Sequence, residues 1–169
     1  MEITTAILCD FAQVREGLLF VSSGGVTRVY HQPDWPLPRP LGLHLGLAVE
    51  VGPDEIDKVH EVRVRVVQQS TAMETAAVVA AMQPLSGLPA QLEAGEAASI
   101  AAAIPLTMVQ LPELGAYDVK VSVDGQPPRI LTVYLKPPPP GVTLKLPKIN
   151  RGPMPPAAPN RQQRRHPQG

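Results

Sequence analysis

The sequence predicts an all-β fold, a two-sheet antiparallel β-sandwich of Ig-like or jelly-roll-like type. Apolar and polar residues alternate in several short stretches, which is the pattern of strands with one buried face. Clusters of turn-forming residues recur roughly every 8–14 residues, the spacing of a sandwich or barrel. Clean alternation also favours antiparallel sheets with one solvated face.

The clearest strand is predicted over Val59–Gln68. Three valines alternate there with three charged residues: Val62, Val64 and Val66 with Glu61, Arg63 and Arg65. Successive strand residues point to opposite faces, so the valines would face a core and the charges would face water.

A closing hairpin is predicted over residues 115–135. Tyr117 and the valines at 119, 121 and 123 share one face of its first strand. Asp124-Gly125 supplies turn residues that tolerate positive φ, and Arg129–Leu135 forms the returning strand. Pro127 and Pro128 fit the loop because neither can donate to a ladder.

The remaining strands are expected on weaker patterns. One of them, over Leu41–Val51, places its leucines and Val49 on one face. The others are Ile3–Asp10, Gly17–Ser23, Gly25–His31 and Glu74–Met82. Leu92–Gly115 is rich in alanine, which favours helix, but Gly95 and Pro105 leave too little room for a stable one. We expect a strand around Ala97–Ile104, with a short helix as the alternative.

A proline-rich connector is predicted over His31–Gly42, which holds four prolines and the chain's only tryptophan, Trp35. Proline fixes φ and disfavours helix in the residue before it, so we expect an extended, polyproline-like segment. Trp35 either caps one end of the core or faces a ligand or partner from this loop.

Composition divides the chain into a domain over residues 1–136 and a tail over residues 137–169. The tail holds ten of the 21 prolines, no acidic residue and six basic ones, so residues 1–136 carry a net charge of −6. The basic residues are Lys145, Lys148, Arg151, Arg161, Arg164 and Arg165. Too few bulky apolar residues remain there to offset the entropy of ordering, so we expect a mostly disordered tail, with Val142–Leu146 as an optional edge strand.

Two stretches carry a resemblance to a known family. Cys9-Asp10, Gly17-Leu18-Leu19 and Gly24-Gly25 occupy the places of its opening strand, its second strand and the following glycine. Its closing hairpin pattern is matched by Pro112, Gly115, Tyr117, Val121, Val123, Asp124 and Gly125, while Val119 stands where the pattern prefers an aromatic. Over residues 3–135 the chain resembles an uncharacterised family of small bacterial β-sandwich proteins. The resemblance implies a two-sheet sandwich and no activity.

No catalytic or metal-binding constellation is evident in the sequence. Cys9, the only cysteine, lies between Leu8 and Asp10, and we interpret it as a small buried hydrophobe rather than a nucleophile. The four histidines show no zinc-ligand spacing, and Gly24-Gly25 lacks the rest of a phosphate loop. The acidic stretch Val51–Lys58 offers too few oxygens for calcium.

The sequence therefore predicts a non-enzymatic interaction or accessory module in the cytoplasm, without cofactor, metal or transmembrane segment. Its partner is expected to be another protein. Arg161, Arg164 and Arg165 add a weaker expectation of contact with nucleic acid or an anionic surface. The alternative is a ligand-binding sandwich, for carbohydrate among other ligands, that uses Trp35 and residues 31–42.

Overall fold

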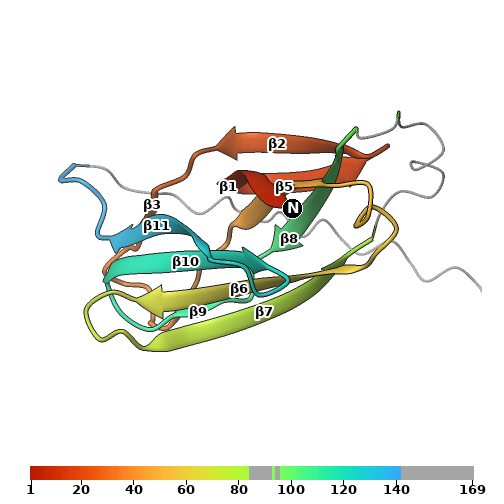
Figure 1. The fold of residues 1–169 in the computed structure, drawn as a ribbon. Helices are drawn as coiled ribbons and strands as arrows, with labels where there is room; N and C mark the ends of the chain where they lie inside the picture. Colours follow the sequence, from red (N-terminus) through yellow and green to blue (C-terminus); the bar gives the residue numbers. More distant parts are fainter. Residues whose placement is uncertain (84–92, 94–95, 142–169) are drawn as a thin grey trace, which may run out of the picture.

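Two β-sheets of four and five strands share one apolar core. The computed structural model describes residues 1–83, 93 and 96–141, and within them it contains eleven strands and no helix. The all-β prediction is confirmed at this level. The four-stranded sheet curls strongly, so its shape departs from the flat pair of layers that the sequence suggested (Figure 1).

The four-stranded sheet has the strand order β2-β1-β5-β8 and is antiparallel throughout. Its strands are β1 (Glu2–Arg15), β2 (Leu18–Gly24), β5 (His44–Val51) and β8 (Ala98–Pro105). The strand expected around Ala97–Ile104 is thereby confirmed over the helix alternative, although residues 92, 94 and 95 lie outside the described part.

The five-stranded sheet has the order β3-β11-β10-β6-β7. Its strands are β3 (Arg28–Tyr30), β6 (His60–Gln68), β7 (Glu74–Met82), β10 (Gly115–Val123) and β11 (Arg129–Lys136). The expectation of purely antiparallel pairing is wrong at its edge, where β3 runs parallel to β11. A parallel pair needs a long connection, and about a hundred residues separate these two strands.

A third, two-stranded sheet pairs β4 (Arg39–Pro40) with β9 (Gln110–Leu111). Neither strand was expected. Residues 31–42 do not form the continuous extended connector that was predicted, because they turn at Pro33-Asp34, where Trp35 N–H donates to the Gln32 carbonyl at 3.1 Å. Proline at the second position of a four-residue turn favours this reversal.

The core is built from alternate residues of facing strands. The valines predicted to face inward on β6 and β10 are all buried, as are Leu45, Leu47 and Val49 on β5. Small branched side chains fill this space because the chain has few aromatics. Tyr117 is the largest fully buried side chain in the described part.

The hairpin of β1 and β2 curls over the outer face of its own sheet. β1 continues to Arg15 rather than ending at Asp10, and beyond Cys9 it pairs with β2 and no longer with β5. A Cβ on Gly46 would lie 3.1 Å from a Val21 methyl and 3.2 Å from an Ile7 methyl, so a larger residue there would push these side chains away by a few tenths of an ångström. This second layer covers the face opposite the core.

A tyrosine fixes the entry into β10. The Tyr117 hydroxyl donates to the Glu113 carbonyl at 2.7 Å and accepts from the Glu113 N–H at 3.2 Å. This is the geometry of a tyrosine corner, in which a buried tyrosine pins the chain just before its own strand.

We expect Tyr117→Phe to lower the free energy of unfolding by about 1 kcal/mol, because both part-buried backbone groups of Glu113 lose their hydrogen-bond partner. Urea unfolding of the full chain measures it. Tyr134→Phe is the matched control, since that side chain is exposed. Equal stability of the two variants would contradict this account of Tyr117.

Candidate functional site

Cys9 is buried on the outer face of the curled sheet. Its side chain is fully inaccessible, and Sγ donates to the His44 carbonyl at 3.4 Å. Burial raises the pKa of the Cys9 thiol, which disfavours the nucleophilic thiolate. The burial expected of Cys9 is confirmed, and it lies where β1 pairs with both β2 and β5.

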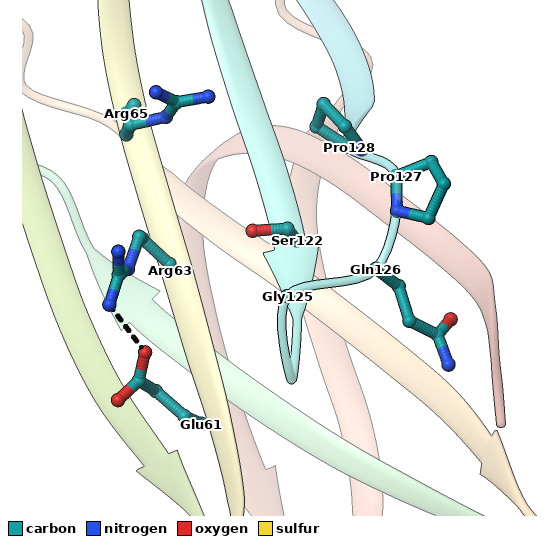
Figure 2. Close-up of a pocket in the computed structure, with 8 residues that line it drawn as sticks. All are labelled: Glu61, Arg63, Arg65, Ser122, Gly125, Gln126, Pro127 and Pro128. Atoms are coloured by element: carbon teal, nitrogen blue, oxygen red, sulfur yellow. Dashed lines mark hydrogen bonds and ion pairs between the residues drawn. The ribbon is translucent and has the colours of Figure 1, made fainter.

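A groove of about 480 Å³ lies on the solvent face of the five-stranded sheet. Figure 2 shows its two walls: Glu61, Arg63 and Arg65 along β6, and the loop after β10 with Pro127 and Pro128. Ser122 lies between them on β10. Sequence alternation placed the two arginines outward, but it could not show that β10 and its loop form the opposite wall.

The charges of this groove are already neutralised. An Arg63 guanidinium nitrogen lies 2.8 Å from a Glu61 carboxylate oxygen, and Arg65 lies 3.8 Å from Glu74. Ser122 has no side-chain hydrogen bond to a histidine or carboxylate among the described residues. The groove therefore offers polar contacts, without an activated nucleophile.

A buried histidine fixes one end of the groove. Asp124 accepts from the Glu61 N–H at 2.7 Å through one oxygen, and its other oxygen lies 2.8 Å from His60 Nδ1. His60 Nε2 lies 3.0 Å from the Glu55 carbonyl. Asp124 has φ 47° and Gly125 φ 74°, so the predicted Asp-Gly turn is confirmed in the left-handed region.

These contacts change the titration of Asp124. Desolvation alone would raise the pKa of its carboxyl, but hydrogen bonds from His60 and the Glu61 N–H outweigh it, so the pKa is lowered. A lowered folded-state pKa stabilises the fold above the ordinary value for aspartate and loses that effect as the pH falls through the folded pKa.

The loop over residues 31–42 places Trp35 beside a shallow hollow of about 400 Å³. Trp35, Pro36, Pro38, Arg39 and Pro40 line this hollow. The two ends of the loop are anchored by backbone hydrogen bonds. The His31 N–H donates to the Lys136 carbonyl at 2.8 Å, and the Leu41 N–H donates to the Val109 carbonyl at 2.7 Å. The loop is thus held by β11 at one end and by the segment before β9 at the other.

Two cationic or titratable side chains pack against Trp35. The Arg39 guanidinium lies 4.2 Å from the centre of the indole ring, and the His31 ring stands nearly perpendicular to it at 6.4 Å. Within the described part, the two buried side-chain polar atoms that lack a hydrogen-bond partner are His31 Nδ1 and Arg39 Nε. Both belong to residues that contact Trp35, which is outside the apolar core cluster.

Further predictions from the sequence concern the tail, metal binding and membrane spans. Arg161, Arg164 and Arg165 lie outside the described residues, as does the optional edge strand over 142–146. Among the described residues, no group of three or more His, Cys, Asp and Glu side chains could hold a metal ion. In that same part of the chain, no helix has the length and hydrophobicity needed to cross a membrane.

The fold is thus an all-β domain with a polar groove, a hollow beside Trp35 and no assembled catalytic group in the described part. A family model described as "Family of unknown function (DUF6941)" matches residues 4–136, and the chain belongs to that family. This confirms the resemblance to an uncharacterised family, while bacterial origin stays a prediction. No curated protein and no solved structure matches the chain.

We expect Asp124→Asn to destabilise the protein above about pH 4 and to lose this effect as the pH falls below that value. Asparagine tolerates the left-handed φ, so the variant isolates the charge. Urea unfolding between pH 3 and pH 5 measures the difference. Asp54→Asn is the control, because that carboxylate is exposed in a loop; a pH-independent difference for Asp124→Asn would contradict the assignment.

Proposed function

We propose that this chain is a non-enzymatic interaction module, built as a two-sheet β-sandwich, that binds an extended segment of another protein along β2. The observation that carries the proposal is the exposed apolar surface of the β1–β2 hairpin. Five of the thirteen exposed large hydrophobic residues in the described part lie on these two strands, and three of them, Phe11, Leu18 and Phe20, share one face of the hairpin. Several exposed large apolar side chains on one face of a strand pair are typical of a binding surface.

The partner is an extended chain because β2 is an edge strand. β2 pairs with β1 on one side, and the described residues supply no strand on its other side. Its unpaired backbone groups are a template for one more strand. β2 carries no charged residue and no proline, which are the usual protection of an edge, so an uncharged, apolar segment fits best.

Two aromatic rings provide the anchor for this partner. Phe11 lies opposite Ser22, and Phe20 lies opposite Gln13, so both rings occupy the same face of the hairpin. The Phe11 ring packs edge-to-face on His44 at 5.4 Å, which holds it in place. Large aromatic side chains held in this way contribute most of the affinity at protein interfaces.

We expect the double variant Phe11→Ser/Phe20→Ser to weaken partner binding by about tenfold or more, since each ring buries a large apolar area in the complex. The measurement uses the full chain as bait in native lysate, with mass spectrometry, followed by titration of the purified partner.

Val79→Ser is the matched control, because Val79 is 59% exposed on β7, the edge strand of the other sheet. A defined protein retained by the control and lost by the double variant supports the proposal. Retention by both variants would overturn it. Size-exclusion chromatography with light scattering tests whether a second copy of the chain occupies β2 instead. A dimer that the double variant abolishes would also overturn the proposal.

A second candidate function is the binding of a small ligand, carbohydrate included, by residues 31–42. The hollow beside Trp35 and the two unpartnered polar atoms next to the indole favour it. Small-molecule sites combine apolar walls with a few polar groups that fix orientation, as this hollow does.

A further inference from the structure

Arg39 is a partly buried cation without a counter-ion. Its guanidinium stacks on Trp35, its Nε atom is buried without a hydrogen bond, and no carboxylate in the described part lies within ion-pair distance. Burial also lowers the pKa of Arg39. A charged group removed from water is costly unless it is paired, so this arrangement calls for an anion from outside the domain.

Four other arginines of the domain either have a hydrogen-bonding or ion-pair partner within it or are solvated. Arg63 and Arg65 have carboxylate partners, and Arg129 donates to the carbonyls of Ile3 and Thr4 at 3.3 and 3.4 Å. Arg28 is exposed on β3 and is therefore solvated. Arg39 differs from all four because it is both withdrawn from water and unpaired.

The surroundings of Arg39 restrict the size and character of the missing anion. The hollow is about 400 Å³, within the range of small-molecule sites, and four of its five lining residues are Trp35 and prolines. A ligand with an apolar body and one anionic group would place the body on the proline and indole surfaces. A guanidinium recognises a carboxylate in a bidentate geometry.

The position is held rigidly from both sides. Arg39 pairs with Leu111 in the β4–β9 ladder, which fixes its backbone. On the other side, Trp35 contacts His31, whose side chain is only 6% exposed and whose Nδ1 lacks a partner. A stacked and anchored guanidinium loses little conformational entropy on binding, so the site is preorganised.

We propose that the hollow between Trp35 and Arg39 binds a small organic carboxylate, with the carboxylate on the Arg39 guanidinium and the apolar body against Trp35 and the prolines. The proposal rests on the second candidate function and narrows its ligand class. A neutral sugar is a poorer fit because it leaves the partly buried guanidinium without a compensating charge.

Trp35 is the only tryptophan of the chain, so its fluorescence reports on this hollow directly. The full chain is titrated with two matched pairs, cyclohexanecarboxylate against cyclohexanecarboxamide and glucuronate against glucose, and with inorganic phosphate. We expect saturable changes with at least one carboxylate, and at least tenfold weaker binding of its neutral counterpart. The two pairs distinguish an apolar acid from an acidic sugar as the source.

Arg39→Gln should weaken carboxylate binding at least tenfold, whereas Arg28→Gln should bind like the unaltered protein. Thermal unfolding of both variants verifies that they are folded. Equal binding of the neutral and the acidic compound of each pair would overturn the carboxylate assignment and leave ligand binding in place. Unchanged carboxylate binding by Arg39→Gln would have the same meaning. Tighter binding of phosphate than of either carboxylate would overturn it too. No saturable change with any probe would overturn both.

Discussion

The register of β10 between β6 and β11 is the constraint on which the rest of the structure depends. One face of β10 presents Tyr117 and three valines to the core, where they are fully or almost fully buried. A shift of one residue would exchange this face for the one that carries Asp118, Lys120 and Ser122. The same register places Ser122 and the loop after β10 beside the charged face of β6, which forms the groove. It also brings the end of β11 beside His31.

The two candidate surfaces differ in how their charges are compensated. In the groove, each arginine has a carboxylate partner from its own sheet, so the groove's cations are paired without a ligand. Around Trp35, burial and stacking bring a cation out of water without supplying its partner. Uncompensated polar groups are retained at functional sites more readily than in structural cores, and this contrast directs attention to the Trp35 loop.

Alternation in the sequence predicted most strands and their buried faces, because a period of two reports directly which side chains leave water. It could not predict strand neighbours: nothing in Arg28–Tyr30 indicates a parallel partner about a hundred residues away. The close packing of the hairpin places Ile7 and Val21 against both Gly24 and Gly46, an arrangement that requires the pairing of three strands. Trp35 could be singled out as the only tryptophan in a proline-rich loop. Its neighbours could not, since Arg39 is placed by Leu111 and His31 by Lys136.

The pairing of β3 with β11 also determines when this domain can fold during translation. β3 leaves the ribosome early, but its hydrogen-bonding partner is the last described strand. Until β11 emerges, β3 has no sheet to join, although β4 of the Trp35 loop can already pair with β9, and β10 lacks one of its two neighbouring strands. Completion of the five-stranded sheet therefore waits for β11, and the nascent chain exposes unpaired β-edges during that interval, which leaves it open to chaperone binding and misassociation.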